Sequence, residues 1–308
     1  MTVAGANTRS IIAMNLAMLG FVVNDTMVKV ASESLPLGQT MFTRGLIASA
    51  LLVGLCLATG AFTRLAILAH PMVIWRVVGE LGATLTYLTG LFHMPIGSVT
   101  AIFQCTPLAV TAAAAIFLGE RVGWRRWMAI AIGFAGVLII VRPGASDFNI
   151  FAISVLISVG FVALRDLATA RMPAEVPTFL ASLLTAVVIT ATGLALKPFE
   201  GWFSAYADWQ PLTPSILMVL AGAAVFLIMG YVFIIVAMRT GEMSVVAPFR
   251  YTILVFALGL GFLVFGEVPD AITLVGAAIV VATGIYTFYR ERLHGQAPAA
   301  TSSIEPNA

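Results

Sequence analysis

Ionisable side chains lie inside several long apolar stretches of this 308-residue chain. The deepest is Glu80, near the middle of residues 72–92, where its short side chain reaches neither end of the stretch. A charge in an apolar medium is costly, so such a residue is a candidate for function. A protonated Glu80 would carry a proton, and an ionised Glu80 would bind an ammonium group. The structural alternative is an ion pair with Arg76, one helical turn away.

Three cations lie a few residues inside other apolar stretches, namely Lys29, Arg44 and Arg250. Each is suited to bind the carboxylate of a small molecule. Two structural alternatives stand beside this role. Their long side chains would extend to the polar boundary of the stretch, and Lys29 would pair with Asp25, four residues earlier.

Uncharged polar side chains at similar depth would add hydrogen bonds to a small molecule. They are Asn24, Tyr87, Gln104, Thr106, Tyr231 and Tyr251. Their alternative role is hydrogen bonding between helices, worth about 0.6 kcal/mol each. Pro107 and Pro248, in the same stretches, each remove a backbone hydrogen bond and would act as hinges or as fixed kinks.

The sequence offers little for metal, cofactor or nucleic-acid chemistry. Its three histidines are scattered over predicted loops and the tail, which does not suit a metal site. No phosphate-binding G-x-x-x-x-G-K-S/T loop occurs, so direct ATP drive within this chain is not expected. A net charge of +2 is too small to indicate a nucleic-acid partner. Cys56 and Cys105 lie in apolar stretches and are expected to pack rather than to form a disulfide.

These residues must be positioned by helices that cross a membrane. Hydrophobic residues make up 60% of the chain and charged residues 10%, with a mean hydropathy of +1.04, whereas a soluble domain is about 25% charged. A helix needs about 20 apolar residues to cross a bilayer. The sequence therefore predicts an all-α integral membrane protein with ten spans, at 11–31, 38–58, 72–92, 98–118, 126–142, 149–168, 177–196, 215–237, 244–265 and 271–289.

One signature occurs twice along these spans. The stretch that opens with Ser98-Val-Thr-Ala closes on Gly-Glu120, and the stretch that opens with Ser244-Val-Val-Ala closes on Gly-Glu267. Because the glutamates are 147 residues apart, we expect two similar halves of five spans each. These are residues 1–145 and 146–290, followed by a disordered cytoplasmic tail at 291–308. Five is an odd number, so the halves would be inverted, an architecture common in secondary transporters.

The distribution of cations predicts the orientation. With ten spans, segments on the N-terminal side contain nine arginines, among them Arg125 and Arg171. The opposite segments hold only Arg142 and Lys197 as clear loop cations. The positive-inside rule then places both termini in the cytoplasm, and the two glutamates of the repeat on opposite faces.

The chain resembles the drug/metabolite transporter superfamily, in its ten-span EamA-type branch, over about residues 10–290. The resemblance rests on the doubled G-E, on Arg44 early in span two, on Pro107, and on glycines in spans five and ten. Those glycines are Gly133, Gly136, Gly276 and Gly284. The chain departs from the pattern at Leu254, where a second proline is expected; Pro248 occurs earlier instead. Length and overall character are similar to bacterial aromatic amino-acid exporters of the YddG type.

The resemblance implies a central cavity lined by spans 1, 3, 4, 6, 8 and 9, with spans 2 and 7 beside it and spans 5 and 10 at the periphery. The glycines of spans 5 and 10 would serve packing within the chain or a homodimer. The expected function is secondary transport in the bacterial inner membrane, exporting aromatic or other neutral amino acids or related small metabolites by alternating access. Efflux of cationic drugs through Glu80, a passive channel and an integral-membrane enzyme are the alternatives.

Overall fold

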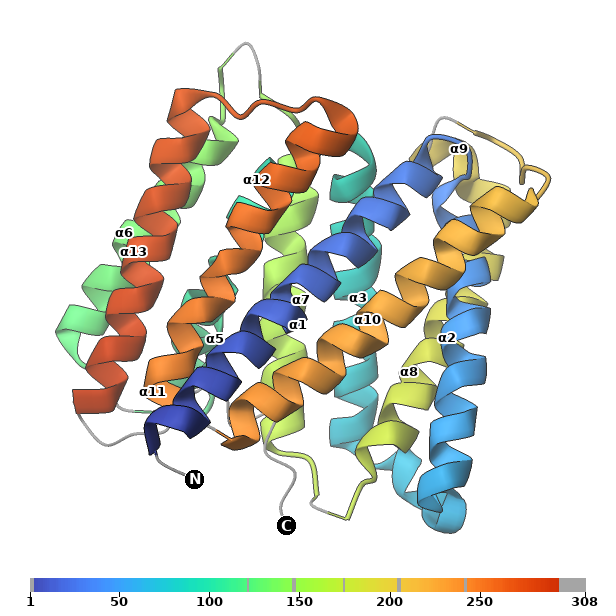
Figure 1. Cartoon of the computed structure of the whole chain (residues 1–308), viewed down its shortest axis with the longest axis horizontal. Helices are drawn as coiled ribbons and strands as arrows, with labels where there is room; N and C mark the ends of the chain where they lie inside the picture. The colour runs from blue at the N-terminus through green and yellow to red at the C-terminus, as the bar shows by residue number, and fades with distance from the viewer. Residues whose placement is uncertain are drawn as a thin grey trace.

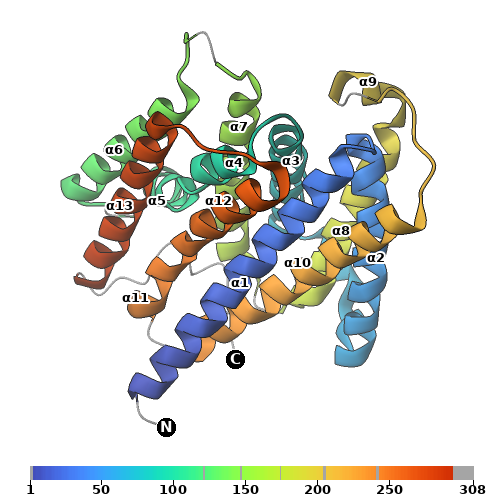
Figure 2. The same cartoon turned by 45° about the horizontal axis from the view of Figure 1, so that its top comes forward.

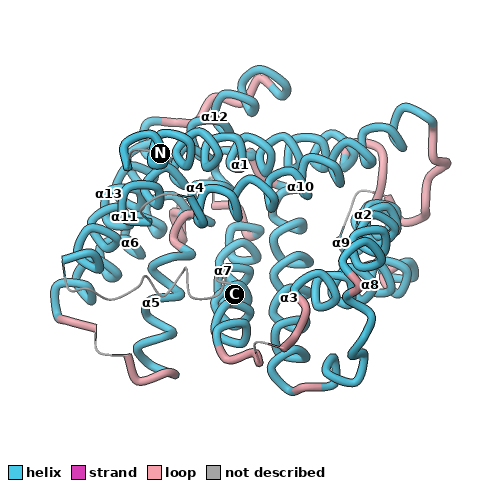
Figure 3. Tube along the Cα trace, turned by 60° about the horizontal axis from the view of Figure 1, so that its bottom comes forward, coloured by secondary structure: helices cyan, strands magenta, loops and turns pink. Residues whose placement is uncertain are grey.

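The computed structural model describes residues 3–120, 122–145, 148–173, 175–203, 206–240 and 243–293. Within these residues all regular structure is helical, and Figure 3 shows helices joined mostly by short loops. The helices are α1 (Val3–Ser32), α2 (Leu37–Thr59), η1 (Ala61–Ala69), α3 (Pro71–His93), α4 (Ile96–Phe103), α5 (Thr106–Phe117), α6 (Trp124–Val141), α7 (Phe151–Ala170), α8 (Thr178–Ala195), η2 (Lys197–Phe199), α9 (Glu200–Phe203), α10 (Pro214–Thr240), α11 (Met243–Val246), η3 (Ala247–Tyr251), α12 (Thr252–Phe265) and α13 (Ala271–Leu293).

The predicted all-α membrane fold is confirmed. Nine helical segments of the described chain are long and apolar enough to cross a membrane. α3 is not among these nine, and it carries Arg76 and Glu80. We assign the tenth span to it because it has 23 residues and packs against α7 and α8 inside the bundle. Each of the ten predicted segments therefore coincides with one helix or with two or three consecutive helices.

Spans four and nine are each interrupted at a proline. In span four, α4 ends at Phe103 and α5 begins at Thr106, with Pro107 in its first turn. In span nine, the short α11 gives way to η3, again with a proline, Pro248, in the first turn. A proline fits the first turn because the N–H it lacks has no helical partner there. Both halves thus have an interrupted fourth helix, although Pro248 lies six residues before Leu254, the position equivalent to Pro107.

Four helix pairs reveal the relation between the halves. They are α1 with α10, α3 with α7, α2 with α8, and α6 with α13 (Figures 1 and 2). Suppose that each span is replaced by the span five places further along the chain, with span 1 following span 10. The pair α1–α10 then becomes α7–α3 and the reverse, whereas α2–α8 and α6–α13 remain the same pairs. This is the pairing that two inverted five-helix repeats produce. The pair α6–α13 lies at one end of the molecule and α2–α8 at the other, as expected for spans 5 and 10 and spans 2 and 7.

Glycines bring α6 and α13 into close contact inside the chain. A Cβ on Gly136 would lie 3.1 Å from the carbonyl oxygen of Gly276, and a Cβ on Gly276 would lie 2.7 Å from that of Gly136. The glycine face of each helix is therefore occupied by the other, an arrangement typical of membrane helices. Packing within the chain accounts for these glycines without a homodimer.

Both ends of the described chain lie on one face of the bundle. α1 begins and α13 ends at the bottom of Figure 1; we refer to this as the terminal face, and to the opposite one as the distal face. The predicted boundary between the halves falls at 145–146, and residues 146 and 147 lie outside the described residues. α13 continues to Leu293, three residues into the segment predicted as a tail, and 294–308 also lie outside them.

Candidate functional site

Glu80 of α3 is bound by a cation from another helix. Its Oε2 lies 2.9 Å from Nη1 of Arg165 on α7. Arg165 also binds its neighbour Asp166, with its Nη2 2.8 Å from Oδ1. Gly79 permits this approach, because a Cβ there would lie only 2.7 Å from the backbone nitrogen of Arg165. The Glu80 and Arg165 side chains are 20% and 26% exposed, so the group is partly shielded from solvent.

Arg76 does not form an ion pair with Glu80. Its Nη1 donates instead to Oγ1 of Thr185 on α8, at 3.1 Å. The structural alternative of a Glu80–Arg76 pair therefore does not form, because α7 brings the guanidinium of Arg165 closer to the carboxylate. Arg76 still acts on Glu80 electrostatically.

A second polar chain joins α1, α2 and α3. The hydroxyl of Tyr87 donates to Oδ2 of Asp25 at 2.7 Å, and Nδ2 of Asn24 donates to its Oδ1 at 2.8 Å. Nη1 of Arg44 donates to Oδ1 of Asn24 at 3.2 Å. Both carboxylate oxygens of Asp25 thus accept hydrogen bonds from Tyr87 and Asn24, and the alternative in which Asp25 pairs with Lys29 does not form.

The two chains belong to one electrostatic cluster at membrane depth. Arg44 interacts with both Asp25 and Glu80. Tyr231 on α10, whose residue is 48% exposed, interacts with Glu80. Arg250, in η3, interacts with Asp166, and its Nη1 is buried without a hydrogen-bond partner in the described part of the chain. Helices of both halves therefore contribute charge to this cluster.

Lys29 lies apart from the cluster, on the distal face. Its Nζ lies 2.7 Å from Oε1 of Glu267 and also donates to the carbonyl oxygen of Met94. The other carboxylate oxygen of Glu267 accepts the backbone N–H of Ile96 at 2.8 Å. Lys29 is consequently already neutralised and is a poor candidate for a substrate carboxylate.

The remaining candidates lie at the helix interruptions. Gln104 is half-buried and directly follows α4. Oγ1 of Thr106 donates to the carbonyl oxygen of Phe103 at 2.5 Å. The Thr106 hydroxyl therefore satisfies a backbone carbonyl at the interruption between α4 and α5. Tyr251 is buried and its ring packs against Phe288 of α13, with ring centroids 6.4 Å apart, so it faces a peripheral helix. Gln104 and Tyr251, at equivalent positions of the repeat, therefore have different surroundings.

The cluster also contains Arg165 and Asp166, which are not apparent from the sequence. They lie near the end of α7, and charged residues are common at the ends of membrane helices. One signal pointed to them: a carboxylate as deep as Glu80 needs a cation from some other helix.

Among the described residues, no group of three or more His, Cys, Asp or Glu side chains could hold a metal ion, and both cysteines are buried free thiols.

The family of the chain follows from comparison with known proteins. The model of the EamA-like transporter family matches it twice, over residues 8–142 and 148–289. The chain belongs to the EamA-like transporter family. Each match covers one group of five spans.

This EamA-like transporter is similar to several bacterial transporters. It is 29% identical over 275 residues to a pseudopaline exporter of Pseudomonas aeruginosa, covering 88% of this chain and 92% of that protein. It is 26% identical over 208 residues to an S-adenosylmethionine uptake transporter of Rickettsia conorii, covering 66% of each. It is 30% identical over 191 residues to a riboflavin transporter of Vibrio cholerae, covering 62% of this chain and 61% of that protein.

The fold is also that of a solved protein crystal structure. The two superpose with a TM-score of 0.56 at 17% identity, over 91% of this chain and 98% of that one, a likeness of fold alone. The family and the named relatives are transporters of small molecules rather than enzymes. This EamA-like protein is therefore a multi-pass membrane transporter, and the membrane-enzyme alternative is set aside.

Proposed function

We propose that this EamA-like protein is a secondary transporter that exports amino acids, aromatic or other neutral, or related small metabolites that carry a carboxylate. The observation that supports this substrate class is the charge balance of the central cluster, where cations outnumber carboxylates by one. One carboxylate from a substrate would neutralise the excess. The cations are Arg44, Arg76, Arg165 and Arg250, and the carboxylates are Asp25, Glu80 and Asp166.

Arg250 is the proposed partner of the substrate carboxylate. Its buried Nη1 makes no hydrogen bond within the described chain, and leaving such a group unsatisfied costs about 1–3 kcal/mol. A carboxylate bound there would remove that cost. By contrast, Arg44 already donates to Asn24 and Arg165 to Glu80. Tyr231, half-exposed and within electrostatic range of the cluster, would contact the rest of the substrate.

The proposed mechanism is alternating access, in which two five-span halves, residues 1–145 and 146–290, rock around this cluster. The interruptions at Pro107 and Pro248 would serve as hinges. Export is favoured by the likeness to the pseudopaline exporter, which extends over 92% of that protein. The bacterial relatives and the excess of arginine on the N-terminal side support an inner-membrane location with cytoplasmic termini.

Efflux of cationic drugs is the less favoured alternative. It requires Glu80 to bind a substrate ammonium group, yet Oε2 of Glu80 lies 2.9 Å from Nη1 of Arg165. An incoming cation would have to displace a guanidinium that is held on the neighbouring helix.

Counterflow in proteoliposomes tests the proposal. We expect saturable uptake of labelled phenylalanine or threonine, accelerated by unlabelled substrate inside. Phenylalaninamide, which lacks the carboxylate, should not compete. Arg250→Gln should raise the KM about tenfold, equivalent to about 1.4 kcal/mol and typical of one lost charge-assisted hydrogen bond.

Arg125→Gln is the matched control, because Arg125 is exposed on the peripheral helix α6 and lies outside the cluster. Its KM should equal that of the unmodified protein. Flux no higher than in empty liposomes, or equal competition by the amide, would overturn the amino-acid assignment. Neither result would affect the family assignment.

A further inference from the structure

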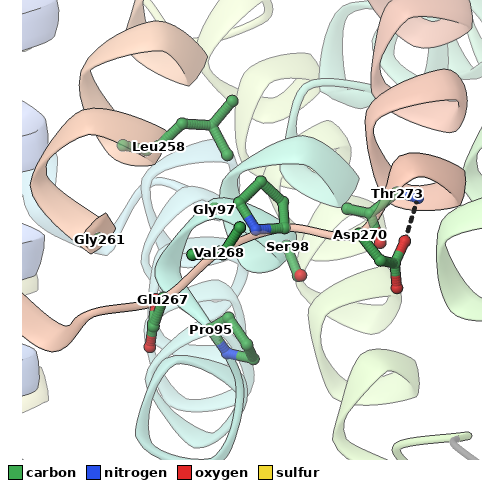
Figure 4. Close-up of a pocket in the computed structure, with 11 residues that line it drawn as sticks. Pro95, Gly97, Ser98, Leu258, Gly261, Glu267, Val268, Asp270 and Thr273 are labelled. Atoms are coloured by element: carbon green, nitrogen blue, oxygen red, sulfur yellow. Dashed lines mark hydrogen bonds between the residues drawn. The ribbon is translucent and has the colours of Figure 1, made fainter.

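Glu267 joins the two halves of the transporter on the distal face. It follows α12 in the C-terminal half, whereas the two groups that its carboxylate binds, Nζ of Lys29 and the N–H of Ile96, belong to the N-terminal half. Lys29 is also held over the ring of Phe265, 5.2 Å from its centroid. Next to Glu267 is a pocket of about 110 Å³ that Ser98 helps to line (Figure 4). An ion pair therefore joins the two halves at this point of the distal face.

Glu120 has the same backbone surroundings in the other half. Gly119 and Gly266, which precede the two glutamates, have φ of 71° and 66°. The N–H of each glutamate bonds to the carbonyl oxygen six residues earlier, at 3.4 Å to Ala114 and 3.0 Å to Gly261. The side chains differ. Glu120 is exposed and makes no hydrogen bond or ion pair with any side chain in the described part of the chain.

Arg171 lies close to Glu120 on the terminal face. It directly follows α7, and its Nη2 donates to the carbonyl oxygen of Phe117 at 3.3 Å, three residues before Glu120. α7 is the first helix of the C-terminal half, as α1 is of the N-terminal half. Lys29 in the last turn of α1 and Arg171 directly after α7 are thus both cations at the end of the first helix of a half, although the 147-residue offset of the repeat does not align them with each other.

We propose that Lys29 and Glu267 form a gate latch for the distal face, and that Arg171 and Glu120 form the equivalent latch for the terminal face. Alternating access requires the bundle to open to one face at a time, so one latch breaks as the other forms. In this structure the distal latch is formed and the terminal latch is not, which corresponds to the state closed on the distal face. The four residues are positioning residues, which set the balance between states and need not touch substrate. The inference rests on the transport function of the family and not on the substrate proposed above.

The accessibility of a reporter cysteine tests the distal latch. Ser98→Cys places a thiol in the pocket beside Glu267, and the two native cysteines are buried, so the unmodified protein gives the background. The full chain is reconstituted in lipid nanodiscs, where both faces are in water, and the rate of reaction with a hydrophilic maleimide is measured. We expect Lys29→Met to raise this rate at least tenfold. Glu267→Gln, which removes the charge but keeps an acceptor for the N–H of Ile96, should act in the same direction.

Two further variants distinguish a latch from general loosening. Asp270→Asn removes another ion pair of the same face, between Arg142 and Asp270, which joins the peripheral helices. It should change the labelling rate less than twofold. When Glu120→Gln is added to Lys29→Met, the labelling rate should return to within threefold of the rate measured with Ser98→Cys alone. Each of the two states, closed on the distal face or closed on the terminal face, then lacks its latch, so neither is favoured over the other by an ion pair.

The outcomes separate the parts of the proposal. An unchanged rate in both Lys29→Met and Glu267→Gln, or an equal rise in Asp270→Asn, overturns the distal latch. A rate that stays high in the Lys29→Met, Glu120→Gln double variant overturns the terminal latch. None of these measurements needs a substrate, so they are independent of the counterflow result.

Discussion

The ion-pair group on α3 and α7 predicts that two substitutions of similar size have unequal effects. Glu80→Gln removes one carboxylate and leaves Arg165 bound to Asp166. Arg165→Gln instead leaves two carboxylates, Glu80 and Asp166, without their cation, and their side chains are only 20% and 13% exposed. Arg165→Gln should therefore destabilise the protein more.

The magnitude follows from the partial burial of the group. Removing one partner of a fully buried pair costs about 3–5 kcal/mol, and an exposed pair contributes less than about 1 kcal/mol. Since the side chains are up to about a quarter exposed, we expect a loss of about 2–3 kcal/mol for Arg165→Gln and about 1 kcal/mol for Glu80→Gln. In a chain of this size, 1 kcal/mol corresponds to about 2 °C in Tm, so the expected decreases are about 4–6 °C and about 2 °C.

The assay is thermal unfolding of the purified full chain in mild detergent, followed by fluorescence. The Glu80→Gln, Arg165→Gln double variant should unfold at a higher temperature than Arg165→Gln alone, because only Asp166 then lacks a partner. Arg125→Gln serves as the control and should leave the Tm unchanged. Equal losses for the two single variants, with an additive double variant, would refute the account of Arg165 as a cation shared by two carboxylates.

Three further predictions concern structural contacts. Glu200→Gln should lower the Tm by about 2–4 °C, because its buried carboxylate accepts the N–H groups of Gly38 and Gln39 in the first turn of α2; an unchanged Tm would contradict this role. Gly136→Val should lower the Tm without changing the oligomeric state measured by light scattering, because the added side chain meets the backbone of Gly276. Arg142 lowers the pKa of Asp270 to about 2, so the pair stabilises the protein above the ordinary pKa of 3.8 and that stability is lost as the pH falls through about 2. The difference in stability between the unmodified protein and Asp270→Asn should accordingly be under about 1 kcal/mol because the site is exposed. This corresponds to less than about 2 °C in Tm, and the Tm difference should be equal at pH 7 and pH 5.

The sequence alone determined the spans, their number and the repeat. A helix in hydrocarbon needs about 20 apolar residues whatever its neighbours are, so each span is a local property of the chain. Residues 72–92 are recognisable despite Arg76 and Glu80, because the apolar length persists around them. The interruptions are local as well, since Pro107 and Pro248 lack an N–H wherever they stand. The doubled G-E likewise indicated two inverted halves before any packing was considered.

Only the tertiary structure determined which acidic side chain forms an ion pair with which basic side chain. Spacing within a helix pairs Glu80 with Arg76 and Lys29 with Asp25, whereas the partners in the fold are Arg165, 85 residues away, and Glu267 in the other half. A pair four residues apart on one helix contributes only about 0.2–0.5 kcal/mol. The interaction between charges grows steeply as they approach in a medium of low polarity. The ion pairs formed where α3 packs on α7 and where the end of α12 packs on α1 are therefore stronger than the pairs available within one helix. Which helices pack together depends on residues that lie far apart in the sequence.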